Sequence, residues 1–328
     1  MTQSLLVVTF EADPENRAII AEVVGDVADI VYLRDVEVPR RHEVLKAATV
    51  VLSRQTANEL RSGEYDLIGG ARLLQFVTAG VDYVPLAGMP AGLPIACNGG
   101  AYAEPMAEHA LAMALAAMKR LFVEHAKVAA GTFDQHRRNR MLAGSVCGIL
   151  GFGGVGVATA RLMKCLGAKV HALNRSGVTA EPVDWIGNGA RLDELLRVSD
   201  VVVVSVPLTP ATEGMIGRRE LELMKPDAVL INLARGEIIE EAALFAHLER
   251  HPEFTACIDA WWVEPIRHGR FRMNHDFTSL PNVIASPHNS ASGVGYRDVG
   301  LRRALANAAR ALKGEAPLHL VGPDDRMQ

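Results

Sequence analysis

A glycine-rich turn after an apolar run constrains the fold of this chain more than any other feature of its sequence. The run VCGIL leads into GFGGVG, and the spacing of apolar residues in VATARLMKCLG, which follows, predicts a helix. A GxGxxG spacing between a strand and a helix is typical of a dinucleotide-binding turn, and the alternative is a tight turn without a ligand. The expected phosphate-binding residues are Gly151, Gly153, Gly154, Val155 and Gly156.

Three glycines of this turn have distinct expected roles. Gly151 permits the sharp reversal, Gly153 lets the backbone approach a pyrophosphate because it lacks a Cβ, and Gly156 lets helix and strand pack closely. The N-terminus of the helix offers unpaired N–H groups and the positive end of its dipole to the phosphates.

The chain as a whole alternates short apolar runs with helical patterns, which predicts parallel sheets covered by helices on both faces. Its 328 residues are long for one core, so we expect two α/β domains with a cleft between them. A Rossmann-type, doubly wound cofactor domain of roughly five parallel strands is expected at residues 99–288. It would be inserted into a smaller flavodoxin-like substrate domain formed by residues 1–98 and 289–328.

Two helices are expected to connect these domains. The segment of residues 103–130 is rich in Ala, Leu and Met and apolar almost all round, which predicts one helix buried between the domains. His109 lies inside it and is interpreted as a packed histidine. The segment Tyr296 to Leu312 is amphipathic and is expected to cross back to the first domain.

Composition excludes several classes of partner. With 49% apolar residues, 22% charged residues and a net charge of -4, we expect neither a nucleic-acid nor a membrane partner. The start of the chain has no basic region of a secretory signal. The four cysteines lack CxxC and metal-ligand spacing, which favours free thiols in a reducing cytoplasm and no metal site. These cysteines are Cys97, Cys147, Cys165 and Cys257.

Asn174 ends the second strand of the cofactor domain, where NAD enzymes usually place an acidic residue that binds the ribose hydroxyls. Asn174 is neutral, and Arg175 and Ser176 follow it. A guanidinium beside a hydroxyl suits a phosphate. We therefore expect NADP in preference to NAD, the alternative being that Arg175 stacks on adenine while NAD binds.

Three later segments, INLARGEIIEEAAL, CIDAWWVEP and IASPHNSA, resemble those of the D-isomer-specific 2-hydroxyacid dehydrogenase family. The stretch SDVVVVSVPLTPATEGMI is also similar to a family segment, and its Pro207 and Thr212 are implied cofactor contacts. VTAGVDYV and AEPMAEHALAMAL look like markers of the first domain. The resemblance runs from Leu73 to the final helix. The matching residues of the three segments are Asn232, Arg235, Gly236, Glu241, Leu244, Asp259, Glu264, Pro265, Ser286, Pro287 and His288.

The resemblance implies an NAD(P)H-dependent dehydrogenase of D-2-hydroxy acids, acting as a 2-oxoacid reductase similar to glyoxylate or hydroxypyruvate reductases. Arg235 would bind the substrate carboxylate and polarise the adjacent carbonyl. His288 would exchange a proton with the substrate oxygen, and Glu264 would orient the imidazole and favour its protonated form. The hydride would come from the nicotinamide.

Further expectations come from the same resemblance. Ala79 and Gly80 would offer backbone N–H groups to the substrate carboxylate, and Asp259 would either contact the nicotinamide or form a structural loop bond. Trp261 and Trp262 would line the pocket or, as we favour, pack and fill the domain interface. The Arg- and His-rich segment that follows Pro265 is expected to be an exposed loop on the cofactor side, the alternatives being that it covers the site or carries extra cations for a polar substrate. A homodimer built through the cofactor domain is also implied.

Two other functions share this fold. One is an NAD(H)-sensing protein similar to the corepressors of the family. The other is a formate or phosphite dehydrogenase, although family formate dehydrogenases carry glutamine at the position of Glu264. The sequence does not distinguish among glyoxylate, hydroxypyruvate, pyruvate and bulkier acids.

Overall fold

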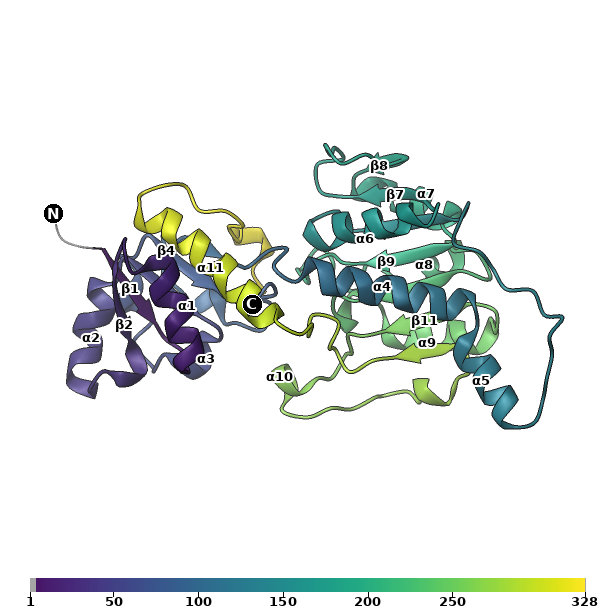
Figure 1. The fold of residues 1–328 in the computed structure, drawn as a ribbon, viewed down its shortest axis with the longest axis horizontal. Helices are drawn as coiled ribbons and strands as arrows, with labels where there is room; N and C mark the ends of the chain where they lie inside the picture. Colours follow the sequence, from purple (N-terminus) through teal and green to yellow (C-terminus); the bar gives the residue numbers. More distant parts are fainter. Residues whose placement is uncertain (1–3, 328) are drawn as a thin grey trace. The chain divides into compact units, whose positions relative to one another are not determined.

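The computed structural model describes residues 4–327 and divides into two compact units. The first comprises the described residues up to Tyr102 and from Gly293 onward, and the second is Ala103–Ser292. The expected boundaries, at 98 and 288, lie a few residues earlier in both cases. Each unit has its own parallel sheet and helices (Figure 1). No helix among residues 4–327 is both long and apolar enough to span a membrane.

The first unit contains a five-stranded sheet in the order β2-β1-β3-β4-β5, in which every pairing is parallel. This is the flavodoxin-like order. The helix α11 (Tyr296–Leu312) packs against α1, β3 and β4, so the end of the chain returns to the first sheet as expected. The other elements are β1 (Leu5–Val8), α1 (Pro14–Val24), β2 (Asp29–Tyr32), α2 (Val38–Ala47), β3 (Val50–Ser53), α3 (Thr56–Glu59), β4 (Leu73–Phe76) and β5 (Ile95–Ala96).

The second unit contains a seven-stranded parallel sheet in the order β12-β11-β10-β9-β6-β7-β8. The chain starts at β6, moves outward to β8, and then returns to β9 on the other side of β6. This reversal is the switch point at which doubly wound sheets bind ligands, beyond the carboxyl ends of the strands. The strands are β6 (Val146–Leu150), β7 (Lys169–Leu173), β8 (Trp185–Gly187), β9 (Val201–Val204), β10 (Val229–Asn232), β11 (Thr255–Ile258) and β12 (Val283–Ala285).

The expectation of five strands in this sheet is wrong, because the edge strands β8 and β12 were missed. Each has only three residues, which is too short to show an apolar alternation. The helices of this unit are α4 (Ala103–Met118), α5 (Leu121–Ala129), α6 (Gly154–Cys165), α7 (Leu192–Val198), α8 (Arg218–Leu223), α9 (Glu241–Arg250) and α10 (Pro265–His268).

The single helix expected at 103–130 is also a wrong prediction. Arg120 has a left-handed backbone, with φ of 56°, and separates α4 from α5. Contacts distant in sequence accompany the break, since Lys119 donates to the carbonyl of Arg140 and Arg120 pairs with Glu253. The apolar pattern continues across the break and therefore does not reveal it. α4 packs on α6, β10 and β11 within the second unit, whereas α5 has no buried residue.

Candidate active site

The glycine turn after β6 has a geometry that only glycine allows at two of its positions. Gly151 has φ of 102°, and a Cβ there would lie 2.6 Å from the amide nitrogen of Val206. A Cβ at Gly156 would lie 2.2 Å from the carbonyl oxygen of Gly151. A Cβ at Gly153 would meet no atom within 4 Å, so the backbone there is open to a ligand.

The helix α6 begins at this open position. Its first residues are Gly154 and Val155, and the residue before them, Gly153, provides no side-chain cap. The first N–H groups of α6 therefore have no capping side chain as acceptor, which is the state in which the start of a helix binds an anion. Together with the open backbone at Gly153, this start of α6 fits the pyrophosphate of a dinucleotide.

The turn after β7 contains the residues expected to distinguish the two dinucleotides. The side-chain oxygen of Asn174 accepts hydrogen bonds from the amide of Gly177 (2.7 Å) and the hydroxyl of Ser176 (3.2 Å). Its side-chain nitrogen donates to the carbonyl of Val178 (2.8 Å). Asn174 thus shapes the turn, and the side chains of Arg175 and Ser176 are exposed on it.

The loop after β9 lies on the other side of the switch point from this turn. The hydroxyl of Thr212 donates to the carbonyl of Pro207 at 2.7 Å and accepts the amide of Thr209 at 2.9 Å. These bonds close the loop on itself. The expected cofactor contacts Pro207 and Thr212 therefore belong to one ordered loop.

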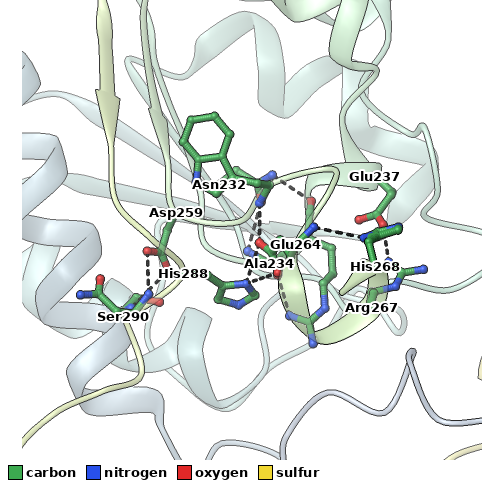
Figure 2. A network of polar contacts seen from close by, with 12 residues as sticks. Asn232, Ala234, Glu237, Asp259, Glu264, Arg267, His268, His288 and Ser290 are labelled. Atoms are coloured by element: carbon green, nitrogen blue, oxygen red, sulfur yellow. Dashed lines mark hydrogen bonds and ion pairs between the residues drawn. The ribbon is translucent and has the colours of Figure 1, made fainter. Parts of the chain in front are cut away.

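His288 and Glu264 are in direct contact, as Figure 2 shows. The imidazole Nδ1 lies 2.7 and 2.8 Å from the two carboxylate oxygens of Glu264. Glu264 also accepts the amide N–H of Trp261 at 2.6 Å. Burial acts to raise the pKa of Glu264, but the bonds from His288 and Trp261 and the charge of Arg235 outweigh it and hold this pKa below its usual value. Glu264 is therefore an anion at neutral pH beside the imidazole.

Arg235 follows β10 in a turn built by Asn232. The Asn232 side chain accepts the amide of Ala234 at 3.0 Å and donates to the carbonyl of Arg235 at 2.8 Å. A Cβ at Gly236 would lie 2.4 Å from the carbonyl carbon of Trp261, so glycine is required for this close approach. Arg235, Glu264 and His288 follow β10, β11 and β12, three adjacent parallel strands.

Asp259 is fully buried and binds the loop that contains His288 (Figure 2). Its carboxylate accepts the hydroxyl of Ser286 and the backbone amides of Asn289 and Ser290. Asp259 was expected either to contact the nicotinamide or to form a structural loop bond, and the structure contains the loop bond. His109 was interpreted as a packed histidine, yet its Nε2 lies 3.1 Å from the Ser286 hydroxyl. Sequence reasoning missed this contact because a helical pattern does not identify a side chain's partner.

Both tryptophans after Asp259 make contacts inside the second unit, so packing is observed there, whereas the expected place in the domain interface stays a prediction. The indole of Trp261 donates to the carbonyl of Ser286 at 2.9 Å. The indole of Trp262 donates to the carbonyl of Ile239 at 2.7 Å and stacks on Phe277. The segment after Pro265 is largely exposed, although Phe277 within it is fully buried.

Ala79 and Gly80 belong to the first unit, in the loop that follows β4. Ala79 is exposed and Gly80 is partly exposed. Their loop lies at the carboxyl end of β4, which pairs with β3 on one side and with the edge strand β5 on the other.

Comparisons with known proteins agree with this arrangement. Residues 111–290 match the NAD binding domain of D-isomer specific 2-hydroxyacid dehydrogenases. A glyoxylate reductase of Thermococcus gammatolerans is 37% identical over 182 residues, which are 55% of this chain and 52% of that protein. A glycerate dehydrogenase of Methylorubrum extorquens is 39% identical over 147 residues, which are 45% of this chain and 43% of that protein. The matched segments thus span about half the length of these relatives.

Among solved structures, a Pyrobaculum aerophilum protein proposed to be a formate dehydrogenase has a TM-score of 0.77 at 28% identity. The match covers 98% of this chain and 99% of that one. The fold and the glycine turn define a dinucleotide-binding protein of the doubly wound α/β class. More specifically, the chain belongs to the D-isomer-specific 2-hydroxyacid dehydrogenase family.

Proposed function

We propose that this protein is an NAD(P)H-dependent reductase of small 2-oxo acids that also oxidises the corresponding D-2-hydroxy acids. The observation that carries the proposal is the contact between His288 and Glu264, with Arg235 on the adjacent strand end. The names of the glyoxylate reductase and glycerate dehydrogenase relatives support the same class of substrate.

The three side chains can divide the chemistry among themselves. Because Glu264 engages Nδ1 of His288, Nε2 is the nitrogen that gives a proton to the substrate oxygen in reduction and takes it back in oxidation. Glu264 holds the ring in this orientation and stabilises its protonated form. Arg235 binds the substrate carboxylate with two parallel N–H groups and polarises the carbonyl.

Two further groups complete the proposed site. The nicotinamide, when bound, supplies or accepts the hydride. The start of α6 and the turn after β7 hold the dinucleotide, and the backbone N–H groups of Ala79 and Gly80 bind the substrate carboxylate.

The experiment is a screen for NADPH and NADH oxidation with glyoxylate, hydroxypyruvate, pyruvate and bulkier 2-oxo acids, with formate and phosphite tested in the oxidative direction. We expect turnover with at least one 2-oxo acid. His288→Ala should lower kcat by at least ~10²-fold, the scale of general acid–base catalysis, while the Kd of the cofactor stays unchanged. Turnover of formate alone, or a near-normal rate for His288→Ala, would refute the proposal.

We propose further that NADPH is the preferred cofactor. The turn after β7 presents Asn174 in place of a carboxylate, so no anion at that position repels a 2′-phosphate. The exposed Arg175 and Ser176 provide donors on the same turn. A cation and a hydroxyl together suit a phosphate better than a ribose hydroxyl.

We propose lastly that the protein is a homodimer formed through the second unit. Leu121, Phe122 and Val128 of α5 are each more than half exposed in the single chain. Phe122 also lines two adjacent hollows, both of which include Ile284 of the edge strand β12. Clustered exposed apolar side chains of this kind mark interaction surfaces.

A further inference from the structure

The backbone at His288 has an unusual conformation. Its φ is 50°, in the left-handed region that residues with a Cβ rarely adopt. Such a conformation persists only where the surrounding structure holds it, and it is concentrated at functional sites. The contacts on both sides of His288 must therefore supply the restraint.

Asp259 holds the chain before and after His288. Its carboxylate accepts the hydroxyl of Ser286 at 2.5 Å, the amide of Asn289 at 3.1 Å and the amide of Ser290 at 3.2 Å. The side chain is fully buried, so water does not compete for these bonds. Glu264 thus fixes the ring of His288, while Asp259 fixes its backbone.

Ser286 connects this carboxylate to a separate helix. Its hydroxyl has one proton, and the 2.5 Å contact indicates that this proton is donated in the hydrogen bond to Asp259. The oxygen is then free to accept Nε2–H of His109, which lies 3.1 Å away on α4. The direction differs from that of a hydrolytic triad, in which serine donates to histidine, so Ser286 is not an activated nucleophile.

The backbone of Ser286 is held as firmly as its side chain. Its amide donates to the carbonyl of Ile258 at 2.9 Å, and its carbonyl accepts the indole of Trp261 at 2.9 Å. Trp261 in turn donates its own amide to Glu264. The two carboxylates that restrain His288 are therefore linked through Trp261 and Ser286.

We propose that Ser286 is a positioning residue for His288, holding residues 286–290 through its hydroxyl bonds to Asp259 and His109 so that the imidazole faces Glu264. The kinetic part of this inference rests on the proposed function, whereas the structural part does not. The contrasting possibility is that the hydroxyl only stabilises the fold.

The test compares Ser286→Ala with Ser286→Thr, which keeps the hydroxyl. In the alanine variant, hydrogen exchange of the Asn289 and Ser290 amides should become at least tenfold faster and kcat should fall by about tenfold to hundredfold, the fold-change expected for losing a bond to a charged group. The Kd of NADPH should change less than about twofold. The threonine variant should restore both the exchange protection and most of kcat.

His109→Leu offers the same test from the other side, with His109→Gln as the control that retains a donor. His109→Leu should also speed hydrogen exchange at the amides of Asn289 and Ser290. It tests the positioning role even if Ser286→Ala does not fold. Unchanged exchange in both Ser286→Ala and His109→Leu would overturn the inference, as would a threonine variant as impaired as alanine. If the wild type reduces no 2-oxo acid, the proposed function fails, and the exchange measurement alone still confirms or refutes the positioning role.

Discussion

The pKa of the Glu264 carboxyl group is set by effects that oppose one another. Burial disfavours its charge, whereas the hydrogen bonds from His288 and Trp261 and the nearby Arg235 favour it, and the net effect lowers its pKa. A carboxyl with a lowered pKa contributes stability above its unfolded value, and that contribution disappears as the pH falls. Glu264 is thus a carboxylate at neutral pH, in contact with the imidazole of His288.

Glu264→Gln should move the alkaline limb of the pH–rate profile for reduction to lower pH. The reason is that the protonated imidazole loses its neighbouring anion and gives up its proton more easily. The measurement is kcat against pH for wild type, Glu264→Gln and Glu264→Asp. The aspartate variant keeps the charge and should shift less. Identical profiles for wild type and the glutamine variant would show that the two groups are not coupled.

The cofactor preference depends on two residues of one turn. Asn174→Asp combined with Arg175→Ala should reverse a preference for NADPH, because the new carboxylate repels a 2′-phosphate and accepts bonds from ribose hydroxyls. Losing one charge-assisted bond is worth roughly 1.5–3 kcal/mol, or about one to two orders of magnitude in affinity. The quantity to measure is the ratio of kcat/KM for the two cofactors, with Arg270→Ala as an exposed control. A wild type that uses NADH equally well would contradict the assignment.

At the scale of single elements, α9 buries a histidine with no polar partner. His247 is 4% exposed, and neither ring nitrogen has a hydrogen-bond partner among the described residues. Burial, followed by the charges of His251 and Arg250, lowers the pKa of His247 to about 4. The ring packs against Phe254 and His251. It is therefore a neutral core residue at physiological pH.

This histidine should make the fold sensitive to acid. Between about pH 6.5 and about pH 4 the unfolded chain binds a proton that the folded His247 does not, so the free energy of unfolding falls as the pH falls. At about 1.4 kcal/mol per pKa unit, the loss is on the order of 3 kcal/mol. The free energy of unfolding, measured with urea at about pH 6.5 and about pH 4, should depend less on pH in His247→Phe than in wild type. His42→Gln, at an exposed position of the first unit, is the control and should keep the wild-type dependence.

The sequence predicts elements with a strong local signal and misses those fixed by distant contacts. β9 is a run of four valines, and the glycine turn joins β6 to α6, so both are evident in the sequence. The break at Arg120 depends on partners such as Glu253, far along the chain. For the same reason the motifs predict Arg235, Glu264 and His288 as a set, whereas the contact between His109 and Ser286 emerges only in three dimensions.

At the scale of the whole molecule, the exposed apolar side chains of α5 predict that two copies of the protein associate. Its apolar side chains are exposed although the helix is part of the cofactor-binding unit. Phe122→Asp should convert a dimer into monomers, because burying an unpaired carboxylate at an interface is unfavourable. Light scattering after size-exclusion chromatography measures the mass, and Val38→Asp, an equally exposed site in the first unit, is the control. A wild-type monomer at all concentrations tested would contradict the dimer.

The position of α11 in the chain has a consequence for synthesis on the ribosome. The strands of the first sheet are made early, but α11, which covers them with Leu301, Leu305 and Leu312, is made only after the whole second unit. The first sheet therefore emerges with one apolar face only partly covered, by α1, and domains generally fold as units during synthesis. We expect the second unit to reach its native packing first, although its synthesis begins later. A chain truncated after Ser292 should accordingly be cleaved by protease within β1 to β5 and be protected around α6.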